Sequence, residues 1–258
     1  MSSSFAAHGV ALYAISYDSV DTLRLFAERH GVTYPMLADE GSTVIRRLGV
    51  YDYALDEHHA AFGRETRPAQ RHVAYPSVFV LDAEGVVVQK RHQPDYRTRE
   101  SGSMLLEEGL GVAVPAGELA TVSRSGVVRV SAWLDVPCAA RYERFRAVVE
   151  LDVDPGWHVY GSPALGGCTA LDLTVEPQEG LDVGVVELPT AATLADGVRA
   201  YEGRVRLALP LSYRVEAGVA DSVLALRMRY QACGELECLA PAQTGIELAV
   251  PICEVEAG

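Results

Sequence analysis

The sequence predicts a layered α/β unit followed by an antiparallel β-sandwich. Apolar runs and helical periods alternate as far as about residue 99, and short alternating strands fill the last half. Between them, residues 109–126 are rich in Gly, Pro, Ala and Ser and show no period. We therefore expect an α/β domain over residues 1–108, a linker over 109–126 and an all-β domain over 127–258.

The α/β elements follow from local signals. The continuous apolar run at residues 10–15 is typical of a strand buried on both faces. Asp18 and Ser19 are good N-caps for a helix that carries apolar residues at helical spacing and ends at Gly31. The further expected elements are a short strand at 34–37, a helix at 42–48, a hairpin of 78–82 with 86–89, and a helix at 103–108.

The second half alternates apolar and polar residues in short segments separated by turn signals. Glycine-containing turns such as the one at Gly156 separate these segments, and no helical period is convincing. The expected strands cover residues 127–133, 145–153, 171–175, 204–211, 223–230 and 246–250.

Composition excludes several classes of partner. The chain has 258 residues, 49% of them hydrophobic, and a net charge of -13, which argues against nucleic acid and anionic membrane surfaces. No run approaches the ~18 apolar residues that cross a bilayer. The N-terminal residues show no basic region and no apolar region, so no signal peptide is visible.

The most informative motif is a pair of cysteines, Cys233 and Cys238, that follows an expected strand. A crosslink around so small a loop removes little chain entropy, roughly 2 kcal/mol, so a structural staple is a weak explanation and redox reactivity a better one. Glu235 and Glu237 disfavour the thiolate of either cysteine. We expect a disulfide that waits for attack by a more reactive partner thiol.

Other interpretations of the cysteines stay open. The pair could form a structural hairpin disulfide or remain as two inert thiols, and a zinc site would need two further ligands that no Cys or His spacing supplies. We expect no metal and no cofactor. The odd count leaves at least one thiol unpaired. Each of the scattered Cys138, Cys168 and Cys253 is expected to be a lone small residue. Solvated histidines are expected at positions 58, 59, 72 and 92.

Residues 127–252 resemble the N-terminal periplasmic domain of the bacterial thiol:disulfide interchange protein DsbD. Three motifs carry the resemblance: Tyr-Gln-Ala-Cys at 230–233 with Cys-Leu-Ala-Pro at 238–241, Gly-Trp-His-Val-Tyr at 156–160, and Ala-Tyr-Glu-Gly at 200–203. The resemblance implies an immunoglobulin-like sandwich with one exchangeable disulfide. Ala240 stands where the family usually has a proline, which concerns the rigidity of the loop rather than its chemistry.

The same resemblance implies roles for particular residues. Cys233 and Cys238 would be the exchanging pair, His158 and Tyr160 would lie near it and shield it, and Tyr230 and Pro241 would flank it. For Tyr160, as for Trp157, ordinary sandwich core is an equally good interpretation. The implied partner is a thioredoxin-like or other dithiol protein, and the implied compartment is the periplasm or cell envelope.

The first half resembles the AhpC/TSA group of thioredoxin-like proteins, in its segments at 10–18, 34–39 and 75–82. This implies a cis peptide bond before Pro76, beside the site of the family's reactive cysteine; an ordinary trans proline at a strand start is the alternative. The family's opening strand and cysteine turn have no match before Val10, and Cys138 is the first cysteine. We therefore expect no peroxidase activity, and either a fragment, which we favour, or a degenerate scaffold that docks a partner.

Three hypotheses of function follow. The first is a redox relay in which the sandwich exchanges its Cys233–Cys238 disulfide with a partner. The second is a non-catalytic interaction module whose disulfide is structural. The third is an antioxidant redoxin, against which the missing nucleophile argues.

Overall fold

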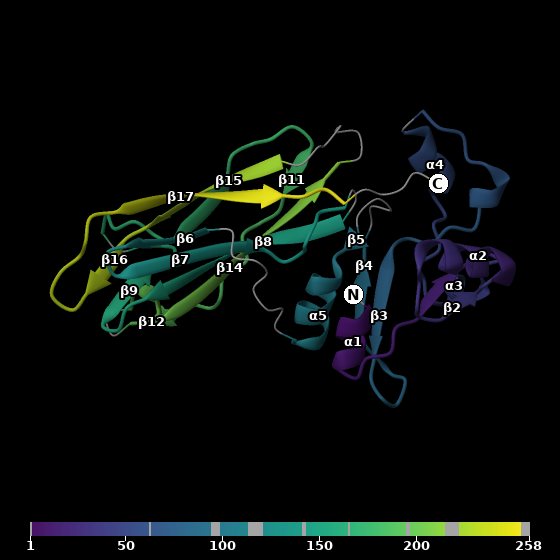
Figure 1. Cartoon of the computed structure of the whole chain (residues 1–258), viewed down its shortest axis with the longest axis horizontal. Helices are drawn as coiled ribbons and strands as arrows, with labels where there is room; N and C mark the ends of the chain where they lie inside the picture. Colours follow the sequence, from purple (N-terminus) through teal and green to yellow (C-terminus); the bar gives the residue numbers. More distant parts are fainter. Residues whose placement is uncertain are drawn as a thin grey trace. The chain divides into compact units, whose positions relative to one another are not determined.

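The computed structural model describes residues 2–61, 63–93, 99–112, 121–140, 143–164, 166–194, 197–214 and 222–253. The chain divides into two compact units, Met1–Gly102 and Ser103–Gly258, whose elements are labelled in Figure 1. Over this part of the chain, the structure contains no helix with the length and apolar character that a membrane crossing requires.

In the first unit, strand β1 (Ala14–Ser16) runs parallel to β2 (Met36–Ala38), and helix α2 (Val20–His30) lies between them in the chain. The helix has the expected ends. The Ser19 hydroxyl accepts a backbone N–H of the first turn at 3.3 Å, and Gly31 adopts a left-handed conformation that suits glycine.

The expectation of a strand buried on both faces is wrong. Tyr13 is 65% exposed, and Ile15 is exposed as well. Among the described residues β2 is the strand that pairs with β1, so the other edge of β1 carries no strand. An apolar run shows only that a strand is suited to burial. The strand is buried only where other elements cover both of its faces.

The remaining elements of this unit are short. They are α1 (Ser2–Ala7), α3 (Thr43–Arg47), α4 (Leu55–Ala60), the 3-10 helix η1 (Pro68–Gln70), β3 (Ser77–Leu81), β4 (Val87–His92) and β5 (Arg99–Glu100). The expected α3 and the expected β3–β4 hairpin are confirmed. The Asp39 carboxylate accepts the N–H groups of Val44 and Ile45 at 3.1 and 2.8 Å, which satisfies two orphan donors of α3.

The first unit therefore combines helices with two separate two-stranded sheets, β1–β2 and β3–β4. The described residues do not form the continuous sheet of a complete thioredoxin-like domain. Several large apolar side chains remain exposed: Val20, Leu25, Phe26, Leu81, Val86 and Val88.

The second unit is a β-sandwich, as the sequence predicts. One sheet has the strand order β11–β14–β8–β7–β6, a second has β10–β15–β17 and a third has β12–β13–β9–β16, all antiparallel. The strands are β6 (Thr121–Ser125), β7 (Val128–Leu134), β8 (Glu143–Val153), β9 (Trp157–Tyr160), β10 (Asp172–Val175), β11 (Leu181–Val183), β12 (Ala192–Thr193), β13 (Arg199–Glu202), β14 (Arg204–Tyr213), β15 (Ser222–Tyr230), β16 (Ala232–Gly234) and β17 (Ala242–Val250).

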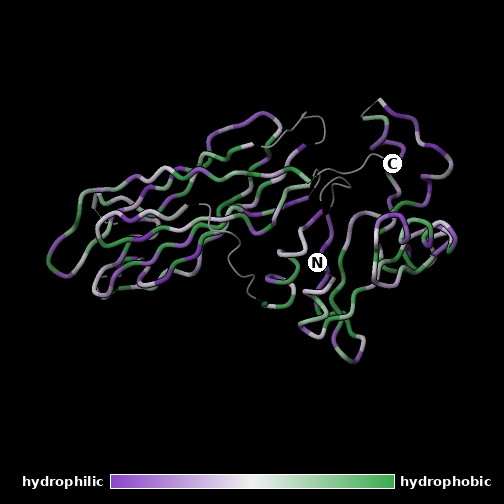
Figure 2. Tube along the Cα trace, in the orientation of Figure 1, coloured by the Kyte–Doolittle hydropathy of each residue, from purple (hydrophilic) through white to green (hydrophobic). Residues whose placement is uncertain are grey.

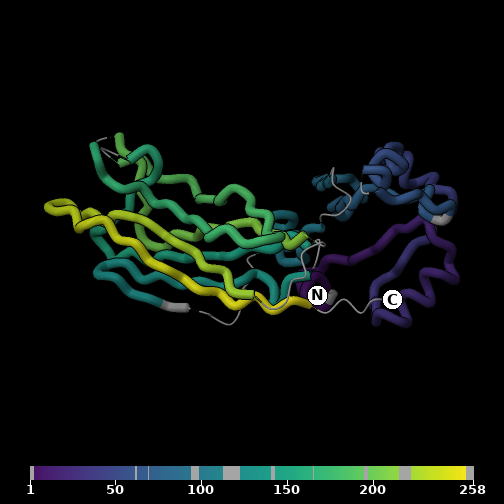
Figure 3. Tube along the Cα trace, turned by 90° about the horizontal axis from the view of Figure 1, so that it is seen from above, coloured from purple at the N-terminus to yellow at the C-terminus, as the bar shows by residue number. Residues whose placement is uncertain are grey.

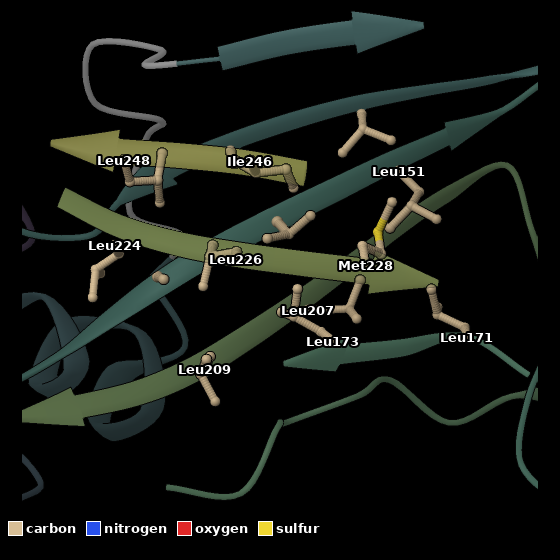
Figure 4. Packing of buried hydrophobic residues seen from close by; sticks show 14 of the residues in the cluster. Leu151, Leu171, Leu173, Leu207, Leu209, Leu224, Leu226, Met228, Ile246 and Leu248 are labelled. Carbon is tan, nitrogen blue, oxygen red and sulfur yellow. The ribbon is translucent and has the colours of Figure 1, made fainter. Parts of the chain in front are cut away.

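The core lies between the sheets. Side chains from β15 and β17 face those from β8 and β14, as the close view of Leu224, Met228, Ile246, Leu151 and Leu207 shows (Figure 4). Hydrophobic and hydrophilic residues alternate along these strands (Figure 2), because successive side chains point to opposite faces. All six strands expected from this alternation are confirmed, with β7, β8, β10, β14, β15 and β17 at those positions.

Helix α5 (Gly102–Leu110) belongs largely to the second unit. The buried guanidinium of Arg146 on β8 binds the buried Asp135 at 2.9 Å and reaches Glu108 at 3.2 Å and Glu107 on α5. These ion pairs join α5 to the sandwich, and the compact units divide after residue 102, at the first residue of the helix, whereas composition predicts the boundary at 108. Within the expected linker at 109–126, residues 121–125 form β6, and 113–120 lie outside the described residues.

A second disulfide joins Cys138 to Cys253, so the expectation that these two cysteines are lone residues is wrong. Cys138 lies in the connection from β7 to β8, and Cys253 follows β17. Backbone hydrogen bonds pair Ala139 with both neighbours of Ile252, from Ala139 N–H to Pro251 O at 2.8 Å and from Cys253 N–H to Ala139 O at 3.0 Å. A separation of 115 residues hides this pairing from any local pattern.

Candidate redox site

The Cys233 and Cys238 segment forms one end of the sandwich. Strand β16 pairs with β9, which places Cys233 opposite His158 and Gly234 opposite Trp157. The chain then turns and returns into β17, and this loop protrudes at the end of the sandwich (Figure 3). A β-carbon on Gly234 would meet the Trp157 ring at 3.6 Å, so the base of the loop packs closely on β9.

Cys233 and Cys238 form a disulfide across this loop, with their Cα atoms 4.0 Å apart. The two residues also form an isolated antiparallel bridge. Within the turn, the Gly234 N–H donates to the Glu237 carbonyl at 2.8 Å. The pairing expected from the sequence is therefore present, and its redox behaviour remains a prediction.

The two cysteines differ sharply in exposure. Cys233 is 1% exposed and packs with Tyr160 and Val198, whereas Cys238 is exposed. A thiolate that approaches from solvent therefore reaches Cys238 first. Access to a sulfur is one of the factors that control thiol–disulfide exchange, and the two cysteines differ in it.

Tyr160 and His158 lie beside the disulfide, as the resemblance implies. The Tyr160 hydroxyl lies 3.9 Å from Cys238 Sγ and donates in this contact, because a disulfide sulfur carries no proton. The His158 ring stands edge-on to the Tyr160 ring, with centroids 5.2 Å apart. The His158 Nε2 atom is buried and has no hydrogen-bond partner among the described atoms.

The side chain of Gln231 holds the base of the loop that carries Cys238 by two hydrogen bonds, a role that the sequence did not predict. Its carbonyl oxygen accepts the Thr169 N–H at 2.9 Å, and its amide donates to the Leu239 carbonyl at 2.9 Å. One side chain thus joins the segment after Cys238 to the loop that follows β9. The available signal was its position inside the Tyr-Gln-Ala-Cys motif.

Cys168 is a further residue of the site that the sequence did not indicate, and Val198 packs there as well. Cys168 is a half-buried free thiol that packs against the cluster of Tyr160, Val198 and Cys233. Both reach the site through loops, and no periodic pattern marks a loop contact in advance.

The other expected neighbours of the site have different positions. Tyr230 is fully buried in the main core, and its hydroxyl has no partner among the described atoms. Trp157 is half-buried and packs against the same core. Pro241 is exposed directly before β17. These three residues shape the base of the loop.

Pro76 lies in the first unit, on a groove of about 340 Å³ whose lining also includes Tyr17, Val50 and Phe79. The expectation of a cis bond before Pro76 is wrong. Among the described residues the cis peptide bond is Ser162–Pro163. The trans form is lower in energy for an X–Pro bond, and the packing around Pro76 does not reverse that preference.

Of the four histidines expected to be solvated, His72 and His92 are exposed, whereas the expectation is wrong for His58 and His59, which are half-buried. His58 is half-buried on α4, and its Nδ1 lies 3.0 Å from the buried Asp52. His59 contacts Thr66 at 3.0 Å. The part of the chain that the structure describes contains no group of three or more potential metal ligands.

Two family models match the sequence. Residues 1–90 match the AhpC/TSA family, and residues 131–249 match the family described as thiol:disulfide interchange protein DsbD, N-terminal. No curated protein matches the chain.

Solved structures give distant similarities. The N-terminal periplasmic domain of ScsB from Proteus mirabilis is 17% identical, with a TM-score of 0.34, over 52% of this chain and 50% of that one. The DsbD N-terminal domain, in a complex with the PilB N-terminal domain from Neisseria meningitidis, is 18% identical, with a TM-score of 0.29, over 40% of this chain and 73% of that one. The yeast GGA1 GAE domain is 10% identical, with a TM-score of 0.31, over 51% and 99%.

The chain spans about half the length of the ScsB structure. By the two family models, the sequence joins a segment that matches the AhpC/TSA family, at residues 1–90, to a β-sandwich that matches the DsbD N-terminal family, at residues 131–249.

Proposed function

We propose that the sandwich is a thiol:disulfide exchange module that relays electrons through Cys233 and Cys238. One observation carries the proposal. A disulfide between one buried and one exposed cysteine lies in a protruding loop, within the segment that matches the DsbD N-terminal family. The partner would be a thioredoxin-like or other dithiol protein.

The proposed order of the exchange follows from the exposure of the two cysteines. A partner thiolate attacks Cys238 Sγ, a new S–S bond forms, and the electron pair of the old bond leaves on Cys233, which becomes a thiolate and takes up a proton. The partner's second thiolate then attacks the sulfur of the partner's first cysteine in the mixed disulfide and releases Cys238 as a thiolate, which takes up a proton. Two electrons and two protons pass from the partner to the sandwich, and the reverse sequence returns them.

Two neighbours assist this exchange. The Tyr160 hydroxyl is placed to donate to Cys238 when that sulfur becomes a thiolate, which favours the charged form. The strand register sets His158 opposite Cys233, and the buried Nε2 atom of His158 has no hydrogen-bond partner among the described atoms. His158 therefore lies on the same face of the sheet as Cys233, beside the position where a thiolate forms once the disulfide opens.

The first unit is proposed to be an incomplete thioredoxin-like domain. Its matched segment contains no cysteine, because Cys138 is the first in the chain. Peroxide reduction by this family's chemistry needs a thiolate nucleophile. Peroxide turnover by the 258-residue chain would contradict this assignment.

The test is a redox titration with thiol alkylation and mass mapping. Of the five cysteines Cys168 is the free one, so the native oxidised protein should take one label, and three after reduction of Cys233–Cys238. We expect a reversible transition between roughly -120 and -270 mV. A pair that stays oxidised below about -300 mV would make it a structural staple and would favour the non-catalytic interaction module.

The second disulfide is the internal reference for this titration. Cys138–Cys253 should remain bonded at every potential that reduces Cys233–Cys238, so five labels should appear only after full denaturation and reduction. A Cys233→Ala variant should lose exchange with a dithiol protein. Unaltered exchange by that variant would refute the proposal.

A further inference from the structure

The tip of the redox loop presents an unusual side chain. Leu236 lies between the two bonded cysteines and is 98% exposed. Its neighbours Glu235 and Glu237 are exposed as well. Single exposed apolar residues are common on protein surfaces and need no explanation by themselves. Leu236 differs from such residues because it lies between the two cysteines of the proposed exchange site.

The loop is held in place from its base. The Gly234 N–H donates to the Glu237 carbonyl at 2.8 Å, and β16 pairs with β9 directly below the turn. The Cys233–Cys238 bond closes the same turn. Leu236 is therefore presented on a short crosslinked turn, and little backbone freedom remains to be lost when a partner covers it.

Exchange at Cys238 requires a partner protein to contact this loop. Exchange needs a thiolate in contact with a disulfide sulfur, and Cys238 is the exposed one. A protein that brings its thiolate there must cover the residues just before Cys238 in the turn. Those residues are Glu237, Leu236 and Glu235.

We propose that Leu236 is the docking anchor of the sandwich, and that Glu235 and Glu237 form an acidic collar around it. The partner is a dithiol protein with an apolar hollow beside its nucleophilic cysteine and basic side chains on the rim of that hollow. The proposal rests on the exchange function and adds to it the chemistry of the partner's surface. Burial of the leucine supplies affinity, and the collar selects by charge.

The first experiment separates docking from chemistry. Rate constants for reduction are measured with reduced thioredoxin and with dithiothreitol, which is too small to contain a hollow. In Leu236→Ser the ratio of the thioredoxin rate constant to the dithiothreitol rate constant should fall on the order of tenfold. In Leu236→Met it should stay near the wild-type ratio, because the apolar contact survives.

Val185→Ser is the matched control. Val185 is also an exposed apolar residue, at 86%. It follows β11, which lies at the other end of the sandwich from β16 (Figure 1). Its ratio should equal that of the wild type.

The second experiment measures the collar with small thiols of opposite charge. For each protein we take the ratio of the rate constant for reduction by cysteamine to that for reduction by mercaptoacetate. At low salt this ratio should be larger in the wild type than in Glu235→Gln/Glu237→Gln, on the order of tenfold. The advantage should collapse in 0.5 M salt, because the Debye length then becomes only a few ångströms. Comparison with the variant cancels the different acidities of the two thiols.

The outcomes are distinguishable. If thioredoxin and dithiothreitol both reduce the wild type and Leu236→Ser leaves their ratio unchanged, the anchor is refuted while the exchange function stands. An equal preference for the two small thiols in the wild type and the glutamine variant refutes the collar. If neither reductant opens Cys233–Cys238, the exchange function itself is refuted, and if only dithiothreitol does, a thioredoxin-type partner is refuted together with the anchor.

Discussion

The two disulfides of the sandwich close loops of very different length, and this predicts different effects on stability. Cys138 and Cys253 are separated by 115 residues, whereas Cys233 and Cys238 are separated by five. The chain-entropy estimate of stabilisation is about 4.8 kcal/mol for the long loop and about 2.1 kcal/mol for the short one. The long-range bond therefore has the properties of a staple, and the short one does not.

The perturbation is removal of each bond by paired alanine substitution. Cys138→Ala/Cys253→Ala should lower the free energy of unfolding of the sandwich by about 4 to 5 kcal/mol, and Cys233→Ala/Cys238→Ala by about 2 kcal/mol. Alanine is chosen because it adds no polar atom at the buried position of Cys233.

Urea unfolding followed by tryptophan fluorescence is the assay. Both tryptophans of the chain, Trp133 and Trp157, lie in the sandwich, so the signal does not include unfolding of the first unit. The slope of the free energy against urea is compared between variants, because a changed slope would show that the unfolded state has become more or less compact.

Equal losses for the two pairs, or a larger loss for Cys233 and Cys238, would refute this reasoning. The short-loop bond would then be a main source of stability, and its assignment as an exchangeable pair would lose its energetic support. Unchanged stability without Cys138–Cys253 would show that the backbone hydrogen bonds around Ala139 suffice to hold the chain end.

Three further predictions concern single residues. Tyr160→Phe removes the donor to Cys238, so alkylation of the reduced Cys238 at neutral pH should slow about fivefold, as measured by mass spectrometry. Gln231→Met leaves two backbone groups of the loop unpaired and should lower the stability of the sandwich by about 1 to 3 kcal/mol, measured by urea unfolding; no loss would show that water replaces the amide. Burial alone would raise the pKa of Asp39, but the backbone N–H groups at the start of α3 lower it overall. Its contribution to the first unit is therefore complete above the ordinary aspartate value and is lost as the pH falls through the lower folded-state value. An acid titration of far-UV circular dichroism checks this, and Asp39→Asn should remove that part of the pH dependence.

Much of the sandwich could be predicted because its signals are local. The alternation from residue 223 to 230 places β15 within one residue of its observed start, and the run from 145 to 153 finds all but the first two residues of β8. Very short strands such as β12 and β16 carry too few residues for a period, so tertiary pairing alone defines them. The same argument holds for the first unit, where the caps Ser19 and Gly31 mark α2 correctly.

The candidate site could be predicted in its sulfur atoms but not in its environment. Cys233 and Cys238 are close in sequence, so a turn between two strands brings them together. Gln231, Cys168 and Val198 reach the same place through contacts across loops. Such contacts have no repeat in sequence, and only the assembled sheets create them.

By itself, the sequence determined the absence of a cysteine before Cys138, and it predicted the order of α/β and all-β segments and Cys238 as the favoured partner of Cys233. These depend on residue identity and on spacing along the chain. Only the tertiary structure decided which of the two cysteines is exposed, that Cys138 bonds to Cys253, that α5 is held by Arg146, and that the bond before Pro76 is trans. Exposure, long-range pairing and buried ion pairs arise when distant segments pack together, and the packing energy that selects them is not a property of any local stretch of residues.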